Sequence, residues 1–118
     1  MAGVGTDIVE ISKIKNYIER EDFLFKTFTQ QELSYANKKD SGKRRAEHLA
    51  TAFAGKEAVF KALGIEYFEP REIEILRDDK GKPYARLSGK TKELAGQKKI
   101  ELSLSFTKDN AAGFAVVN

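Results

Sequence analysis

The sequence predicts an α+β domain in which an antiparallel sheet packs against one long helix, with short helices beside it. Apolar residues recur at helical spacing through residues 43–63, whereas residues 100–106 alternate strictly between apolar and polar side chains. Strand patterns dominate after the long helix, and this segregation favours the α+β class. At 118 residues the chain is long enough to form a single domain, 1–118, with its own core.

In chain order, the first elements are a strand and two helices. β-branched residues in 4–11 predict the strand, and Ser12 is placed to cap the helix that follows. Residues 29–32 read Thr-Gln-Gln-Glu, a capping-box pattern that predicts a short helix to about Asn37. The polar stretch 38–43 predicts a mobile loop before the long helix.

The second half of the chain is expected to supply most of the sheet. Gly64 is placed to end the long helix, and turn residues at 78–81 lie between two alternating segments, which predicts a β-hairpin. Residues 91–95 predict a weak helical turn. A last strand of small and apolar residues, 111–117, is expected to pair with the strand at 100–106.

Composition limits the chemistry that the chain can perform. Its 41% hydrophobic and 33% charged residues are typical of a globular protein and exclude a disordered one. The lack of Cys excludes thiol catalysis and thiolate metal sites, and a single His excludes a polyhistidine zinc site. Any metal would therefore be a hard ion bound by oxygen, and Mg²⁺ is the natural candidate.

Charge and hydropathy indicate the kind of partner. No apolar run approaches the roughly 20 residues of a membrane span, so we expect a cytoplasmic protein that does not contact membranes. The net charge of +3 and the isoelectric point near 9.1 suit an anionic partner, such as a phosphate compound or an acidic protein.

One carboxylate lies beside the apolar face of the long helix. Glu57 is about 40° from Phe53 around the helix axis, so its side chain is expected to be partly desolvated. Such a group usually has a cation, a hydrogen-bond donor or a metal as its partner. Lys61, one turn on, would make an ordinary helix pair worth about 0.2 to 0.5 kcal/mol. The helix alone leaves the structural and functional interpretations open.

A second carboxylate, Asp7, stands among apolar residues in the first strand. Alone it is weak evidence for a site, because an aspartate at a strand end is more often a turn or cap residue than a ligand. Together with Glu57, however, it would offer two oxygen ligands for Mg²⁺, which typically binds one or two carboxylates and completes its shell with water and substrate phosphates. The ion would also relieve the repulsion between the two carboxylates.

Basic residues at the start of the long helix offer a phosphate site. Arginine forks suit phosphate, and a helix N-terminus favours anions, so Lys43, Arg44 and Arg45 are candidates; a solvated charge run is the alternative. We assign no catalytic role to His48.

Four segments together resemble the small holo-acyl-carrier-protein synthases, a family of phosphopantetheinyl transferases. The resemblance runs nearly from end to end, and its most specific part contains Lys56, Glu57 and Lys61. The segments are Gly5-Thr-Asp7, residues 53–62, Asp79-Lys-Gly-Lys-Pro83 and Ser103-Leu-Ser-Phe-Thr-Lys108.

The resemblance implies transfer of the 4′-phosphopantetheine arm of coenzyme A to a serine of apo acyl carrier protein. Adenosine 3′,5′-bisphosphate would be released, and the product would support fatty acid synthesis. Asp7 and Glu57 would hold Mg²⁺ on the pyrophosphate, Glu57 would take the serine proton, and Lys61 would balance charge on the transferred phosphate. The residues expected to hold coenzyme A are Lys43, Arg44, Arg45, Lys82, Pro83, Thr107 and Lys108.

The resemblance also implies a homotrimer with its sites between subunits, for which the small residues 111–113 would suit close packing. A basic face on the first helix, with Lys13, Arg20 and Lys26, would dock the acidic carrier protein. The family usually has His at the position of Phe106 and an aromatic residue at that of Asn110. Since Phe cannot bond phosphate, we expect altered coenzyme A affinity or donor preference, with Phe106 in the core.

A rival interpretation is a non-catalytic module that binds phosphate or RNA without Mg²⁺. It would use Lys43, Arg44 and Arg45 together with Lys38, Lys39, Lys98 and Lys99, and its binding would depend steeply on salt. It gives no reason for Asp7 or Glu57, and we expect no nucleic-acid partner.

Overall fold

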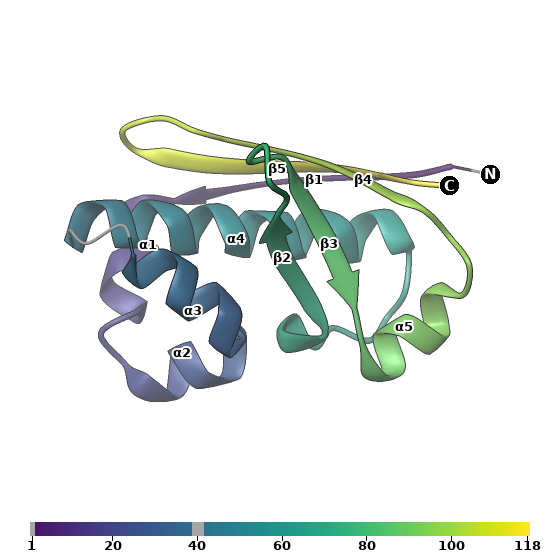
Figure 1. Ribbon diagram of the computed structural model, residues 1–118, viewed down its shortest axis with the longest axis horizontal. Coiled ribbons are helices and arrows are strands. Elements are labelled where there is room, and N and C mark those ends of the chain that lie inside the picture. The colour runs from purple at the N-terminus through teal and green to yellow at the C-terminus, as the bar shows by residue number, and fades with distance from the viewer. Residues whose placement is uncertain (1, 39–41) are drawn as a thin grey trace.

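Helix α4 (Gly42–Leu63) lies along one face of a three-stranded antiparallel sheet in the computed structural model, which describes residues 2–38 and 42–118 (Figure 1). The strand order is β1 (Gly3–Glu10), β5 (Asn110–Val117), β4 (Ile100–Phe106). The expected α+β class, with an antiparallel sheet on one long helix, is confirmed.

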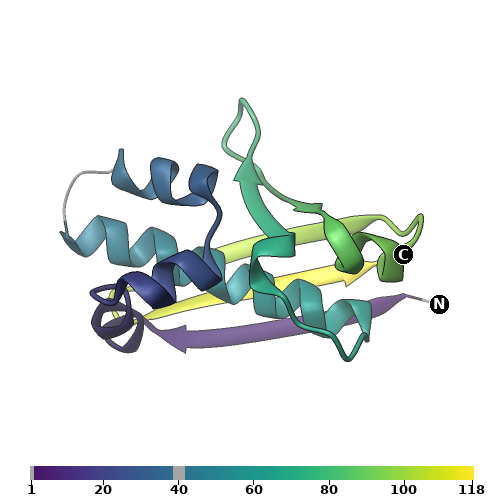
Figure 2. The ribbon, with the colours of Figure 1, turned by 90° about the horizontal axis from the view of Figure 1, so that it is seen from below.

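The remaining elements form two groups along α4 (Figure 2). Short helices cover its N-terminal half, and a second, two-stranded sheet with one more helix covers its C-terminal half. The first group contains α1 (Ile11–Tyr17), α2 (Glu21–Thr27) and α3 (Gln30–Asn37); the second contains η1 (Pro70–Glu72), β2 (Ile73–Arg77), β3 (Pro83–Leu87) and α5 (Gly89–Ala95).

Glycines bring β1 and β5 unusually close to α4. A Cβ atom at Gly5 would overlap the carbonyl oxygen of Ala58, and one at Gly113 would lie 2.6 Å from that of Ala54. Only residues without side chains permit this backbone contact. The close approach carries the neighbouring Asp7 to the side of α4, as described below.

Two apolar clusters lie on either side of the middle of α4. One joins its N-terminal half to α1 and α3 through residues such as Ile14, Phe28 and Leu49. The other joins its C-terminal half to both sheets through residues such as Val59 and Ile73. The long helix is therefore the common wall of both clusters.

Several predicted boundaries are correct. Thr29 Oγ accepts a hydrogen bond from the Glu32 amide, and Glu32 accepts one from the Thr29 amide, so the capping box forms as expected. Gly64 follows α4 with a φ of 70°, a conformation that glycine readily adopts. The hairpin turn at 78–81 and the strand at 100–106 also lie where the sequence predicts them.

Other expectations were wrong at the level of boundaries and pairing. The first strand ends at Glu10 and α1 begins at Ile11, so Ser12 is not the cap; the Ile11 amide instead donates to the Asp109 carbonyl. Helix α2 was not predicted. The hairpin crosses α4 obliquely, and β3 does not pair with β4, so the chain has two sheets rather than one. Of the expected loop 38–43, residues 39–41 lie outside the described part.

Within the described ranges, no helix is both long and apolar enough to cross a membrane.

Candidate active site

Asp7 and Lys61 meet where β1 contacts the C-terminal half of α4. The Lys61 Nζ atom lies 3.1 Å from Asp7 Oδ1 and donates a second bond of 3.0 Å to the Thr6 carbonyl. The Lys61 side chain is 49% exposed and the Asp7 side chain 15% exposed. The ammonium is therefore anchored at the strand and still faces solvent.

Glu57 completes the group one turn before Lys61. Burial raises the pKa of the Glu57 carboxyl, the negative charge of Asp7 raises it further, and the Lys61 ammonium opposes both effects. A carboxylate with a raised pKa binds a proton more readily than a free one, as a general base at neutral pH requires. The expected Glu57–Lys61 ion pair is absent from the described contacts, because Lys61 pairs with Asp7 instead.

The second oxygen of Asp7 fits a metal ligand. Asp7 Oδ2 is buried and, among the described residues, has no hydrogen-bond partner. An unsatisfied buried carboxylate oxygen is costly, and a cation bound there would remove that cost. No group of three or more potential metal-binding acids, Cys or His forms in the described chain. Asp7 and Glu57 thus suit an ion such as Mg²⁺ that takes its other ligands from water and substrate.

Lys56, the residue before Glu57, is completely buried and forms an ion pair of 2.7 Å with Glu32 of α3. Our sequence analysis gave this pair no role. The signal was present, because Lys56 lies about 60° from Phe53 around the helix, still on its apolar side.

The structure does not bring the predicted phosphate-binding residues to these carboxylates. Arg44 and Arg45 lie about 18 to 20 Å from Glu57 along the axis of α4, at 1.5 Å per residue. Arg45 Nε donates a 2.7 Å bond to Asn37 Oδ1 and thereby links α3 to α4. Lys43 is the second residue of α4, but its side chain lies outside the described part.

The other predicted contacts for coenzyme A lie on two turns. In the β4–β5 turn, Thr107 Oγ accepts a 3.2 Å bond from the Asn110 amide, and Lys108 is exposed. In the β2–β3 turn, Lys82 precedes Pro83, and Lys82 Nζ lies 3.8 Å from Glu101. Within one chain, neither turn shares a described contact with Asp7 or Glu57.

Phe106 does not belong to the core, contrary to our expectation. Its side chain is 47% exposed at the end of β4, and its ring centroid lies 6.5 Å from that of His48. Phe106 continues the apolar alternation of β4, but no other described element covers the strand at that point, so the pattern alone gave the wrong prediction. His48 in turn packs edge-to-face on Tyr35.

The three basic residues predicted to dock a carrier protein do not share one helix. Lys13 lies on α1, which ends at Tyr17, while Lys26 lies on α2. Arg20 is the N-cap of α2 and pairs with Asp22 at 3.4 Å. The undetected start of α2 explains the error, since a single helix was assumed.

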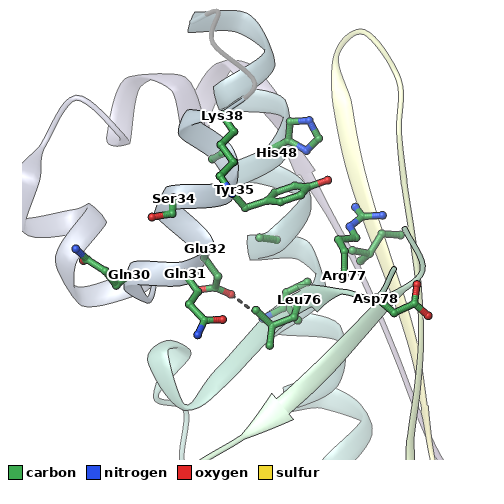
Figure 3. A pocket seen from close by; sticks show the side chains of 14 residues that line it. Gln30, Gln31, Glu32, Ser34, Tyr35, Lys38, His48, Leu76, Arg77 and Asp78 are labelled. Carbon is green, nitrogen blue, oxygen red and sulfur yellow. Dashed lines mark hydrogen bonds between the residues drawn. The ribbon is translucent and has the colours of Figure 1, made fainter. Parts of the chain in front are cut away.

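Two cavities of about 430 Å³ flank α4. Figure 3 shows the first, where Tyr35 of α3, His48 of α4 and Arg77 of β2 surround an opening. The second lies between β1 and α1 and is lined by Lys13, Phe53 and others. Its wall includes Phe53, which lies one turn before Glu57 on α4.

The chain is similar over nearly its full length to proteins of one family. A family model described as the 4′-phosphopantetheinyl transferase superfamily matches residues 3–115. The holo-[acyl-carrier-protein] synthase of Clostridium novyi is 46% identical, over 98% of this chain and 86% of that protein. The synthase of Fusobacterium nucleatum is 38% identical, over 98% of this chain and 97% of its own length.

Solved structures give the same result. An ACPS–CoA complex from Chronobacterium ammoniagenes superimposes with a TM-score of 0.87 at 28% identity, over 99% of this chain and 96% of that one. A holo-(acyl-carrier-protein) synthase from Bacillus anthracis in complex with CoA (3′,5′-ADP) gives 0.81 at 32% identity, over 98% and 94%. The chain therefore belongs to the 4′-phosphopantetheinyl transferase superfamily and, within it, to the holo-[acyl-carrier-protein] synthases.

Proposed function

We propose that the chain transfers the 4′-phosphopantetheine arm of coenzyme A to a serine hydroxyl of an apo acyl carrier protein. The serine oxygen forms a bond to the phosphorus that carries the arm, the pyrophosphate bond breaks, and adenosine 3′,5′-bisphosphate leaves. The observation that carries this proposal is the grouping of Asp7, Glu57 and Lys61, with one buried oxygen of Asp7 unpartnered. The solved relatives with bound coenzyme A support the donor.

Each residue of the group has a distinct role. Asp7 and Glu57 would hold Mg²⁺, which would neutralise charge on the pyrophosphate. Glu57 accepts the serine proton, directly or through a water molecule, because its raised pKa suits that transfer. Lys61, anchored on Asp7 and the Thr6 carbonyl, presents its exposed ammonium to the transferred phosphate.

The cavity between β1 and α1 is the approach that we propose for the acceptor. Phe53 in its wall lies one turn before Glu57, and Lys13 in its wall would attract an acidic carrier protein. Arg20 and Lys26 would extend this attraction over α2 as separate contacts. Reversing Lys13 and Arg20 to Glu should raise the KM for the carrier and flatten its salt dependence.

We include a homotrimer in the proposal because, within one chain, the residues predicted to hold coenzyme A share no described contact with Asp7 or Glu57. The face of the three-stranded sheet opposite α4 carries Val4, Ile8 and Phe114, which are 60%, 69% and 46% exposed. No described element covers this apolar face (Figure 1), and such faces mark interfaces. Of the small residues predicted there, Ala111 and Gly113 are buried against α4, so only Ala112 can contribute.

The oligomer is tested by light scattering after size-exclusion chromatography. The wild-type chain should elute as a trimer and Phe114→Lys as a monomer with lower activity. A wild-type monomer with full activity would refute this part.

The transfer itself is tested by the intact mass of a purified apo acyl carrier protein incubated with the chain, coenzyme A and Mg²⁺. We expect a gain of one phosphopantetheine and none with a chelator. An unmodified carrier, alongside a control transferase that modifies the same sample, would refute the proposal. We also propose that the reaction takes place in the cytoplasm and that the modified carrier serves fatty acid synthesis.

The RNA-binding alternative receives no comparable support. It leaves the unpartnered oxygen of Asp7 and the raised pKa of Glu57 without a role.

A further inference from the structure

The buried ion pair between Lys56 and Glu32 connects α4 to three other elements. Lys56 Nζ donates to Glu32 Oε1 of α3 at 2.7 Å, to the Pro70 carbonyl of η1 at 2.8 Å and to the Ile73 carbonyl of β2 at 2.9 Å. A lysine ammonium has three donors, so its capacity is fully used. We call this arrangement the Lys56 clamp.

Glu32 is equally saturated. Its Oε1 also accepts from the Thr29 amide at 2.8 Å, and its Oε2 accepts from the Ile75 amide at 2.7 Å. The capping box of α3 and the start of β2 therefore share one carboxylate with the middle of α4. Both side chains are removed from solvent, with 0% and 1% exposure.

Stability alone does not explain such a clamp. Replacing a buried ion pair by apolar residues of similar volume is often neutral or stabilising, because desolvation opposes the attraction between the charges. What a saturated pair provides in addition is direction, since each short bond holds only at one position of the helix. The clamp therefore fixes both the rotation of α4 about its axis and its position along that axis.

On the opposite side of α4, the described side-chain bonds to β1 are those of the partly exposed Lys61 to Asp7 and to the Thr6 carbonyl, and they join the helix to that one strand. There the helix contacts β1 through Gly3 and Gly5, whose missing side chains leave strand backbone directly against the carbonyl groups of Ala62 and Ala58. Helices are normally held in register by side chains that fit between the turns of a neighbour, and glycine offers none. Glu57 lies next to Lys56 in sequence, but it faces the side of α4 that contacts β1.

We propose that Lys56 and Glu32 are positioning residues that hold Glu57 opposite Asp7 in the geometry needed for cation binding and transfer. The clamp touches neither substrate nor cation and acts through the rotation of α4. The inference rests on the proposed function for its kinetic effect. Its effect on cation affinity can be measured without any transfer reaction.

The test compares the double variant Lys56→Met/Glu32→Gln with the wild-type chain. The double variant leaves no unpaired buried charge, and Gln retains the capping-box pattern, so the fold should persist. Circular dichroism and a melting curve establish that it does. The control, Thr91→Val, removes the 2.9 Å bond from the buried Thr91 hydroxyl to Glu72, and neither residue is a described partner of Lys56 or Glu32.

The first readout is Mn²⁺ affinity, measured by electron paramagnetic resonance without coenzyme A or carrier. The folded double variant should bind Mn²⁺ about tenfold to a hundredfold more weakly, the usual effect of removing groups that orient metal ligands. The control should stay within about twofold of wild type. The second readout is turnover at saturating Mg²⁺, where kcat should fall about tenfold or more while the KM for the carrier changes little.

Equal Mn²⁺ affinity in the folded double variant and the wild type would overturn the inference, as would an equal loss in the control. A wild-type chain that binds no Mn²⁺ would also overturn it. A wild-type chain that binds Mn²⁺ but modifies no carrier would refute the proposed function, while the Mn²⁺ comparison would still decide the inference.

Discussion

Two lysine–carboxylate pairs lie on opposite sides of α4, and they differ in almost every physical respect. Lys56–Glu32 is buried and all of its described hydrogen-bonding groups have partners. Lys61–Asp7 is partly exposed, and one oxygen of Asp7 has no partner among the described residues. We call the first pair closed, because its bonding groups already have partners. We call the second pair open, because it can still bind a cation and a substrate.

The difference shows how one helix separates structure from chemistry. A group that is to change its contacts during a reaction needs unused bonding capacity and access to solvent, whereas a group that fixes geometry needs neither. Lys56 and Glu57 are adjacent in sequence, yet the rotation of about 100° between them places one in each environment. The identity of a residue therefore says less about its role than the helix face on which it lies.

The largest expected effect comes from replacing Glu57, the proposed proton acceptor beside the open pair. Glu57→Gln should lower kcat by about a hundredfold or more, as loss of a general base does. Thermal stability at neutral pH should be equal or higher, because a partly buried carboxylate beside Asp7 is lost. Steady-state kinetics and melting curves measure both. Glu47→Gln on the same helix is the control, and a Glu57→Gln enzyme with near-normal turnover would remove Glu57 from the mechanism.

The two lysines should next give opposite results when each is replaced by Met. Lys56→Met leaves a buried, unpaired carboxylate and should lower the free energy of unfolding by about 3 to 5 kcal/mol. Lys61→Met removes the described ion-pair partner of the mostly buried Asp7 and should cost less, about 1 to 3 kcal/mol, while abolishing most turnover. Urea unfolding with the transfer assay separates the two. Equal stability losses would break the distinction between a closed and an open pair.

The pH dependence of stability should reveal the raised pKa of Glu57, which lies beside the open pair. The folded state holds the Glu57 proton more tightly than the unfolded state, because the pKa of the buried carboxyl is raised. Between the unfolded and folded pKa values the native state thus binds more protons, and the free energy of unfolding falls as pH rises. Melting curves in chelator should show this decline in the wild type and a smaller one in Glu57→Gln. Identical slopes would argue against the raised pKa.

The smallest effect is expected at a position outside both pairs. Phe106 is exposed near the β4–β5 turn, where a His could bond a phosphate of the donor. Phe106→His should lower the KM for coenzyme A by about tenfold or less, as one added bond to a charged group allows. Neither kcat nor stability should change much, and Phe106→Leu serves as the control. A changed kcat with unchanged KM would place Phe106 in the chemistry instead.

The elements with a strong local pattern were the predictable part of this fold. The long helix, the capping box at Thr29 and the strand ending at Phe106 follow from periodicity and cap chemistry within a few residues. Helix α2 and the separation into two sheets do not, because they depend on how the short helices and the hairpin pack against α4. Local sequence contains little of that information.

The site shows the same limit. The sequence indicated Asp7, Glu57 and Lys61 as a group, but the only partner it could suggest for Lys61 by spacing was Glu57, one turn away. The fold brings Asp7 closer through the glycines of β1. The Lys56 clamp joins residues 24 positions apart, and no periodicity connects them. Pairings across elements are therefore what the structure added.

The most direct test of the account is the position of a divalent cation in crystals of the chain soaked with Mn²⁺. Anomalous scattering should give a peak within bonding distance of both Asp7 and Glu57, and none beside Glu32, whose oxygens are already occupied. A peak bound by other residues, or none at a Mn²⁺ concentration that supports transfer, would contradict the claim that the open pair of α4 is the cation site.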